Sequence, residues 1–462
     1  MLFNSLPFLY GFFPATYIVF WLLKSKTQRY FWLTVTGYGF YSAWNYKFCA
    51  LMAFSTLVAY LAGLGMLRWR ESWQRRLCLI IPVTTDLALL GFFKYANFAL
   101  ETTSQLGSWF GWPLALPRLD VVLPVGISFY TFHTVTYIVD SYRRVIVPTR
   151  NFFEFSCYVS LFAQLVAGPI VRFRQIEADL ERIDRADRAK NLDIGTSFFV
   201  IGLAKKVLIA DTIAAVIDPA LSRYNELSSL DAWLCVLGYT YQLYFDFSGY
   251  SDMAVGLGHL FGLRLPQNFN SPYQALDIAD FWRRWHISLS SFLRDYLYIP
   301  LGGSRRVTPV VYRNIMITMI LGGLWHGANW TFVIWGCYHG LLLVLYRMTQ
   351  SGWNLLPAPL RGALTFVLVV IGWAIFRSTD IAMAETLLRS LFSWQPGGGI
   401  VGGNVLLLSL GLAASLAHLG PNTFEIHHQW SAATAVGMAL LFGLSVFVIY
   451  GTRSTPFLYF QF

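Results

Sequence analysis

Ionisable and polar residues interrupt several strongly apolar stretches of the 462-residue sequence, and the first such group centres on His326. This histidine is flanked by glycines in the apolar stretch Ile315–Tyr346, and Asn329 follows one turn later. A titratable side chain is costly at membrane depth, so its presence there favours a function. A buried imidazole stays neutral and is the usual general base near neutral pH, whereas the structural alternative is a hydrogen bond to a neighbouring helix. His326 is therefore a candidate base, and Asn329 could orient its ring or bind a substrate carbonyl.

A second group lies in the segment Asp280–Tyr296, where His286 stands between Arg283 and Arg294. On a helical wheel, the aromatic and leucine side chains of this segment form an apolar sector of about 160° that includes His286. The two arginines fall beside this sector, as is typical of a helix at a membrane interface. The pattern predicts one amphipathic helix whose histidine faces the protein or the bilayer. It leaves open whether His286 takes part in chemistry or only packs.

A third group, Gln242–Asp252, places the carboxyl groups of Asp246 and Asp252 among hydroxyl groups and glycines in an apolar stretch. Such a segment can break a membrane helix and line a cavity. It can equally form polar contacts between packed helices. Two neighbouring lysines, Lys205 and Lys206, interrupt another apolar stretch, where they could snorkel or pair with an acidic residue. The sequence does not decide between a cavity and a structural role for this group.

The composition is that of a membrane protein. Charged residues make up 13% of the chain and hydrophobic residues 56%, whereas ordinary soluble domains carry about 25% charged residues. This composition excludes a disordered chain, a coiled coil and a disulfide-stapled secreted domain, and it argues against a soluble enzyme. The five cysteines are scattered without a CxxC spacing, so neither a metal site nor a disulfide framework is predicted. No phosphate-binding loop, dinucleotide-binding fingerprint or nucleophile elbow occurs.

Apolar stretches of suitable length predict an all-α, polytopic transmembrane helical bundle with about ten to twelve spans. The candidate spans are Leu6–Leu23, Phe31–Trp44, Phe48–Leu67, Leu77–Phe98, Val121–Val139, Gly195–Val216, Trp233–Phe261, Ile315–Tyr346, Ala363–Phe376, Val405–His418 and Ala432–Tyr450. Of these, Trp233–Phe261 could be broken, and Ile315–Tyr346 is long enough for two short helices. No repeat or soluble segment is visible, so residues 1–462 are expected to form a single membrane domain.

The net charge of +10 is explained by the excess of Lys and Arg that membrane proteins carry in cytoplasmic loops. This bias places the N-terminus and the loop around residues 101–120 outside the cell membrane, and the segment Arg264–Arg313, which has seven arginines, in the cytoplasm. The stretch Phe152–Val171 would reverse this order if it crossed the membrane, so it is expected to be re-entrant or to lie along the surface. Nucleic-acid binding would need a basic soluble module, and none is visible.

Four stretches of the sequence together resemble the membrane-bound O-acyltransferase family, in its bacterial branch that acetylates exported polysaccharides such as alginate and cellulose. They are Leu123–Arg144, Gln242–Gly258, Phe281–Gly303 and Leu321–Gly340. The family's intramembrane histidine falls on His326 through a Trp-His-Gly motif, and its second active-site histidine falls on His286 through Arg-Trp-His-Ile-Ser. The resemblance does not separate alginate from cellulose as the polymer.

The resemblance implies a helical bundle around a central tunnel in the bacterial inner membrane, with a periplasmic N-terminus and lipid around the spans. The expected reaction is acyl transfer from a cytoplasmic donor, acetyl-CoA, with no bound cofactor or metal. His326 would act as the base and His286 would assist it. Candidate substrate-binding residues are Asn329, Asp246, Arg283 and Arg294.

The expected partner is a periplasmic acetyltransferase or carrier protein, whose hydroxyl group would accept the acetyl group before the polymer does. Three other functions remain open at this point: a D-alanyl transferase of the same family, a lipid O-acyltransferase, and a transporter. A transporter is expected to show inverted repeats between its halves. The sequence shows none.

Overall fold

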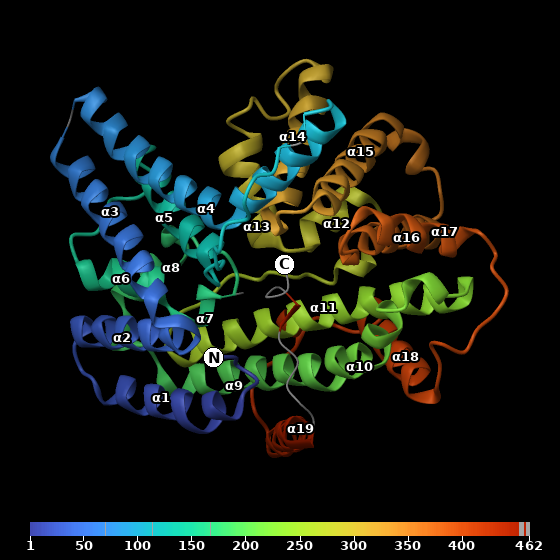
Figure 1. Cartoon of the computed structure of the whole chain (residues 1–462). Coiled ribbons are helices and arrows are strands. Elements are labelled where there is room, and N and C mark those ends of the chain that lie inside the picture. Colours follow the sequence, from blue (N-terminus) through green and yellow to red (C-terminus); the bar gives the residue numbers. More distant parts are fainter. Residues whose placement is uncertain (70, 113, 167, 452–456, 459–462) are drawn as a thin grey trace. The chain divides into compact units, whose positions relative to one another are not determined.

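The computed structural model describes residues 1–69, 71–112, 114–166, 168–451 and 457–458, and within these ranges it contains helices and no strand (Figure 1). The predicted all-α class is therefore confirmed. The chain forms two compact units, one of residues Met1–Gly195 with Ala254–Pro266, the other of Thr196–Met253 with Gln267–Phe462. Each unit is described by itself, and the single-domain organisation stays a prediction.

The first unit is built from helices of very different length. Its elements are η1 (Phe8–Phe12), α1 (Phe13–Leu22), α2 (Lys26–Asn45), α3 (Cys49–Arg68), α4 (Ser72–Trp109), α5 (Ile127–Tyr142), α6 (Phe152–Ser160), α7 (Phe162–Leu165) and α8 (Phe173–Glu181). Helix α2 begins at a capping box, in which the Ser25 hydroxyl accepts from the Gln28 amide and the Gln28 side chain accepts from the Ser25 amide. The stretch Phe152–Val171 forms two short helices, so it does not cross a membrane as one helix.

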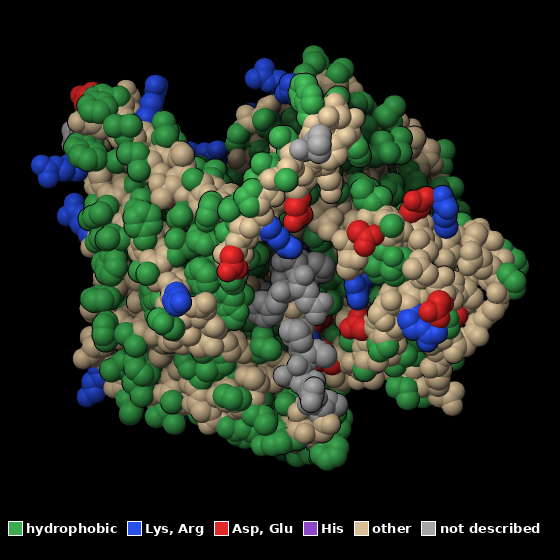
Figure 2. Space-filling view, viewed as in Figure 1, with side chains coloured by type: hydrophobic (Ala, Val, Ile, Leu, Met, Phe, Trp, Pro, Cys, Tyr) green, Lys and Arg blue, Asp and Glu red, His purple; other side chains and the backbone are tan. Residues whose placement is uncertain are grey.

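The surface of the first unit is apolar along its long helices. Large side chains of α3 and α4 point outward, for example Leu61, which is 55% exposed, and Ile80, which is 54% exposed. Figure 2 shows hydrophobic side chains over much of the visible surface of these helices. A soluble protein rarely leaves such large contiguous apolar surfaces in water. Surrounding lipid explains this surface.

The second unit contains all the candidate site residues. Its elements are the end of α9 (Arg188–Ala204), η4 (Lys205–Ala210), α10 (Asp211–Leu221), most of α11 (Ser229–Leu260), α12 (Ile278–Arg284), α13 (Ile287–Leu293), η7 (Arg294–Tyr298), α14 (Thr308–His326), α15 (Trp330–Trp353), α16 (Ala358–Arg377), α17 (Ile381–Phe392), α18 (Asn404–His418) and α19 (Ala432–Gly451). Neighbouring helices α14 and α15 lie side by side, and α16 packs against α15 (Figure 1).

The segment Gln242–Asp252, for which the sequence left a helix break and polar helix contacts equally open, contains no break, because α11 runs through it without interruption. Both carboxyl groups find lysine partners on the neighbouring element η4. Asp246 pairs with Lys206 at 2.5 Å, and Asp252 pairs with Lys205 at 2.7 Å. Since each buried charge is compensated by a partner, the helix can carry them without unwinding. The alternative of polar contacts between packed helices is the one that the structure supports.

The single amphipathic helix predicted for Asp280–Tyr296 is wrong. The segment forms α12 and α13 with a break between them, followed by the π-helix η7. His286 lies at the break in the left-handed region, with φ of +44°. Backbone hydrogen bonds to another segment hold this bend: Ile287 N donates to Asn268 O, and Asn270 N donates to Arg284 O, both at 2.9 Å.

Five stretches of helix in the described part of the chain are long and apolar enough to cross a membrane. They are Lys26–Arg68, Ser72–Trp109, Trp330–Trp353, Ala358–Arg377 and Ala432–Gly451. Two shorter apolar helical stretches, Phe8–Leu22 and Asn404–His418, accompany them. These helices show a multi-pass membrane protein, while the expected total of ten to twelve spans stays a prediction.

Candidate active site

His326 is the last residue of α14, at the corner where this helix turns back into α15. The expected pair of helices within Ile315–Tyr346 is thus confirmed. The two helices approach closely because Gly323 has no side chain: a Cβ atom there would lie 2.2 Å from the carbonyl oxygen of Phe332. Gly327 continues in an extended conformation, and Asn329 begins α15.

Aromatic side chains surround the His326 imidazole, which is 6% exposed. The Trp325 ring centroid lies 5.0 Å from that of His326, and the Trp335 ring meets it edge-on at 5.2 Å. Phe376 of α16 makes a third edge-on contact at 5.1 Å. These rings exclude water and restrict the orientation of the imidazole, which is what a positioned base requires.

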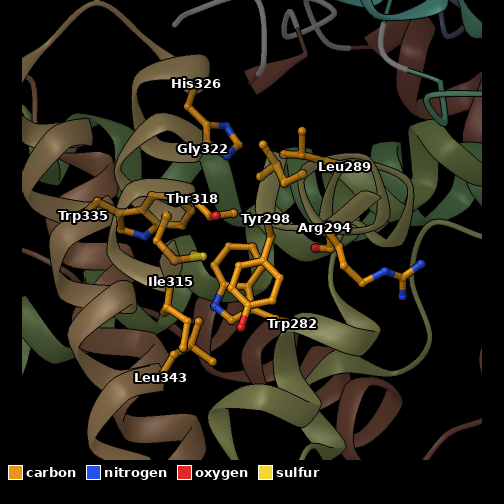
Figure 3. Close-up of a pocket in the computed structure, with 13 residues that line it drawn as sticks. Trp282, Leu289, Arg294, Tyr298, Ile315, Thr318, Gly322, His326, Trp335 and Leu343 are labelled. Atoms are coloured by element: carbon orange, nitrogen blue, oxygen red, sulfur yellow. The ribbon is translucent and has the colours of Figure 1, made fainter. Parts of the chain in front are cut away.

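A cavity of about 190 Å³ extends from His326 along α14, and its lining is almost entirely apolar. It is lined by Trp282, Leu289, Ser290, Leu293, Arg294, Tyr298, Ile315, Thr318, Met319, Gly322, His326, Trp335 and Leu343. Figure 3 shows the His326 ring at one end of this space and Leu343 and Trp282 at the other. Among the described residues that line the cavity, Arg294 alone is charged, and its guanidinium points away from the cavity (Figure 3).

His286 is fully buried, and the side-chain amide of Asn268 holds its imidazole. Its Nδ1 lies 3.1 Å from Asn268 Oδ1, which also accepts hydrogen bonds from the Ser288 amide at 3.2 Å and from the Ser288 hydroxyl at 2.8 Å. Because an amide oxygen only accepts, Nδ1 of His286 carries the proton and Nε2 is the basic nitrogen. His286 lies outside the five membrane-crossing stretches, and burial lowers the pKa of its imidazole far below the usual range, which keeps it neutral at pH 7.

The structure brings the two histidines to the same tryptophan. The Trp325 ring lies 5.9 Å from the ring of His286 and 5.0 Å from that of His326. His286 does not line the apolar cavity, whereas His326 does. The two imidazoles therefore occupy different surroundings within one aromatic cluster, one at the cavity and one in the protein interior.

The other candidate substrate-binding residues have separate places. The Asn329 side chain caps α15, where its Oδ1 accepts from the Thr331 amide at 3.0 Å and its Nδ2 donates to Thr379 O at 2.7 Å. Asp246 is buried in its ion pair with Lys206. Neither residue lines the cavity beside His326.

The two arginines of the second group also differ. The Arg283 side chain is 65% exposed and lies 3.4 Å from Asp280. The Arg294 side chain is 62% exposed, pairs with Asp295 at 2.7 Å, and belongs to the cavity lining. Of the tentative substrate-binding residues, Arg294 is thus the one that the structure joins to His326 through the same cavity.

A second cavity, of about 330 Å³, lies beyond the corner that follows His326. It is lined by Gly327, Ala328, Asn329, Phe332, Arg377, Ser378 and Thr379, and so is much more polar than the first. Arg377, at the end of α16, contacts Asp218 at 3.4 Å and lies over the Tyr239 ring. Residues of the His326–Asn329 corner thus line two cavities, of which the second has the larger polar share in its lining.

No group of three or more His, Cys, Asp or Glu residues that could hold a metal ion occurs in the described residues. The five cysteines, all within the described ranges, are free thiols. The prediction of an enzyme without a metal or a bound cofactor remains a prediction, since it concerns what the working protein contains.

Several residues of the site were not identified from the sequence. Asn268 and Ser288 hold His286, Trp335 and Phe376 surround His326, and Arg377 lines the polar cavity. Asn268 precedes His286 by 18 residues in a loop, where no periodicity marks it. Trp335 lies nine residues beyond His326 in the same glycine- and aromatic-rich segment, and this richness was the one available signal.

Comparison with known proteins identifies the family. Residues 130–378 match the model of the membrane-bound O-acyltransferase family. The chain is 43% identical to the probable alginate O-acetylase of Pseudomonas aeruginosa over 408 residues, which cover 86% of this chain and 76% of that protein. It is 40% identical to the probable alginate O-acetylase of Pseudomonas putida over the full length of both chains.

A further relative, the peptidoglycan O-acetyltransferase of Helicobacter pylori, is 36% identical over 85% of this chain and 80% of its own length. The family match includes α14 and α15 with the corner at His326, as well as the His286 bend. The expected resemblance is thereby confirmed. This multi-pass membrane protein belongs to the membrane-bound O-acyltransferase family and is an O-acyltransferase.

Proposed function

We propose that this enzyme takes an acetyl group from cytoplasmic acetyl-CoA and passes it across the bacterial inner membrane for O-acetylation of an exported polysaccharide of the alginate type. The observation that carries the proposal is the apolar cavity that joins Arg294 and Tyr298 to His326. The alginate O-acetylase names of two relatives support the acetyl group and the polymer. The peptidoglycan O-acetyltransferase of Helicobacter pylori makes peptidoglycan the second candidate polymer.

The charges of α14, α15 and α16 support the direction of transfer. These helices pack in sequence and run antiparallel, so the start of α14, the end of α15 and the start of α16 share one side. That side carries the five arginines Arg305, Arg306, Arg313, Arg347 and Arg361. The opposite side carries the corner at His326 and a single arginine, Arg377. By the positive-inside rule the arginine-rich side is cytoplasmic, and the polar cavity faces the periplasm.

Helix α14 is not among the five long apolar stretches, but its length fits a route through most of the membrane. Its 19 residues correspond to about 28 Å, close to the thickness of the hydrocarbon core. An acyl donor that enters beside Arg294 can therefore extend through the apolar cavity to His326 while its phosphates stay on the cytoplasmic side. The exposed arginines of this side supply the charge that phosphate groups bind.

The transfer step follows from the placement of His326. Its imidazole takes the proton from an acceptor hydroxyl as the hydroxyl oxygen attacks the thioester carbonyl. The new C–O bond forms, the C–S bond breaks, and the leaving thiolate takes the proton from the imidazolium. A base positioned in this way commonly contributes 10²–10⁴-fold to the rate. His286 assists through the cluster that it shares with Trp325.

The acceptor approaches from the polar cavity on the other side of the corner. Ser378, Thr379 and Arg377 offer hydrogen-bond groups there, as an alcohol acceptor requires. The proposed acceptor is a hydroxyl group of a periplasmic acetyltransferase or carrier protein, which then esterifies the polymer. The same charge argument supports a periplasmic N-terminus.

The test is acetyl transfer by the purified protein in proteoliposomes, with radiolabelled acetyl-CoA on the arginine-rich side and a periplasmic extract of the source strain on the other. The wild type should transfer label to protein and polymer, and His326→Gln should reduce the transfer by at least 10²-fold without loss of the folded protein. Transfer at the wild-type rate by His326→Gln would contradict the assignment of the base.

Alternative donors decide between the related functions. D-alanyl and long-chain acyl donors should give no transfer. Faster transfer from either donor than from acetyl-CoA would contradict the proposed acetyl transfer and identify the related function. Alginate and peptidoglycan acceptor fractions, assayed side by side, distinguish the two candidate polymers.

A further inference from the structure

The segment Phe457–Leu458 lies far along the chain from the candidate histidines, yet it packs against the helix that supports His286. Phe457 is 1% exposed, and its ring stacks on Tyr250 of α11 with centroids 4.8 Å apart. The same ring lies 5.7 Å from that of Phe247. Phe247 in turn meets the His286 ring edge-on at 4.7 Å. Phe247 thus contacts both Phe457 and His286.

Asp246 holds this segment in place. The Leu458 amide donates to Asp246 Oδ2 at 3.0 Å, whereas Oδ1 of the same carboxylate lies 2.5 Å from Lys206 Nζ. Asp246 is 1% exposed. A buried carboxylate needs partners for both oxygens, because desolvation costs several kcal/mol otherwise. Among the described residues, Leu458 supplies the hydrogen bond to Oδ2 that the lysine does not.

The close packing of η4 against α11 allows the ion pair to form. Gly249 of α11 packs against Gly202, which lies in the last turn of α9 just before η4. A Cβ atom at Gly249 would lie 2.6 Å from the carbonyl oxygen of Gly202. Lys206, one turn beyond Gly202, reaches both Asp246 and Asp211, the latter at 2.7 Å. Asp246, Phe247 and Tyr250 are spaced to share one side of α11, so a segment bound to the first also contacts the other two.

We propose that Phe457 is a positioning residue for His286. Its ring supports Phe247, and Phe247 holds the imidazole in the orientation that its hydrogen bond to Asn268 requires. The buried Asp246–Lys206 pair, which the transfer step does not use, anchors the segment through the Leu458 amide. The inference rests on the proposed function, because it assigns a part in acetyl transfer to His286.

Substitutions at Phe457 test the inference through kcat and KM measured on the folded protein. Phe457→Ala removes the support behind Phe247 and should lower kcat about tenfold, since a small misplacement of an orienting group can cost up to ~10²-fold. The KM for acetyl-CoA should stay unchanged, because Phe457 does not line the donor cavity. Phe457→Leu fills most of the same volume and should recover most of the lost rate.

Two substitutions at Leu458 isolate the anchor. Leu458→Pro removes the amide hydrogen that Asp246 accepts, whereas Leu458→Ala removes side-chain atoms and keeps that hydrogen. Leu458→Pro should lower kcat as Phe457→Ala does, and Leu458→Ala should remain close to the wild type. Equal kcat values for the two Leu458 variants would show that the hydrogen bond does not matter to catalysis and would overturn the anchor.

The matched control is Phe198→Ala, which removes another buried ring of the same unit. Phe198 is 3% exposed and packs on Phe424 and His428. This variant should lower the thermal midpoint but keep kcat per folded molecule. An equal kcat loss in Phe198→Ala, or full kcat in Phe457→Ala, would overturn the inference. A wild-type chain that transfers no acetyl group would instead contradict the proposed function itself.

Discussion

His326 and His286 are both buried, but their surroundings suit them to different roles in the reaction. Aromatic edges surround His326, and an apolar cavity opens beside it. His286 is fixed by Asn268, which determines the nitrogen that carries the proton. A group that meets the substrate needs open space, whereas a group that orients a neighbour needs fixed partners. The surroundings therefore favour His326 as the base and His286 as its assistant.

The role of His286 is tested by His286→Asn. Asparagine tolerates the left-handed backbone at this position, where φ is +44°, so the bend should survive. The imidazole and its contact with Trp325 are lost, and we expect acetyl transfer per folded molecule to fall at least tenfold, since orienting groups contribute up to ~10²-fold. The measurement is the transfer rate divided by the amount of monodisperse protein.

A matched control for this prediction is His133→Asn. His133 is also fully buried, but it lies on α5 in the first unit. This variant should lose stability and keep its activity per folded molecule. Unchanged specific activity in His286→Asn would leave His286 with a packing role alone.

The burial of both histidines could be predicted from the sequence, because each stands in an apolar context. The partners of His286 could not. Asn268 lies in a loop, and only the folded chain brings it to the imidazole. The corner at His326 was predictable in outline, since glycines and a length sufficient for two helices mark it. The two cavities could not be predicted, because side chains from several helices form each of them and local sequence patterns do not show which helices meet.

At the scale of elements, the bend between α12 and α13 shows why helical periodicity failed. The helical wheel assumed one continuous helix, and it placed His286 on the buried side for that reason. The side chain is buried, but the cause is different. Hydrogen bonds from Ile287 and Asn270 link the bend to a neighbouring loop segment, and they outweigh local helix propensity. Polar partners likewise explain why α11 continues through its two acidic residues.

The start of α15 offers a prediction at this scale. Asn329→Ala removes the cap and should lower the free energy of unfolding by about 1 kcal/mol. Asn329→Ser keeps a capping oxygen and should restore most of that loss. We expect Asn329 to act only as a cap, because its Oδ1 and Nδ2 are engaged by Thr331 and Thr379. Both variants should therefore retain their transfer activity per folded molecule.

Thermal unfolding in detergent, followed by transfer assays on the folded fraction, measures both quantities. A large loss of activity in Asn329→Ser, with normal stability, would instead support the binding of a substrate carbonyl by this side chain.

For the whole molecule, the distribution of arginines predicts the orientation that the proposed function needs. We expect the N-terminus and the segment 101–120, which includes the last turns of α4, to lie in the periplasm and the segment Arg264–Arg313 in the cytoplasm. Single cysteines placed at Ser5, Ser104 and Ser304, in a chain whose own cysteines are replaced, should report this in intact cells. An impermeant maleimide should label the first two and spare the third until the cells are opened.

Hydrophobic length and charge made the membrane location and the all-α class predictable, because both depend on composition along the chain. Labelling of Ser304→Cys in intact cells would contradict the predicted orientation and, with it, the proposed direction of transfer. The same labelling, extended to each loop between the predicted spans, counts the membrane crossings, for which we expect ten to twelve.

The almost entirely apolar lining of the cavity beside His326 has a consequence for the energetics of crossing. Moving one elementary charge through a membrane potential of 100 mV involves about 2.3 kcal/mol. Arg294, the one charged residue among the described lining residues, turns its guanidinium away from the cavity. In the proposed reaction the acetyl group enters as a neutral thioester and leaves as a neutral ester, so the electrical gradient neither drives nor opposes its passage. Export of the group then draws its free energy from the thioester alone and continues in cells whose membranes are depolarised.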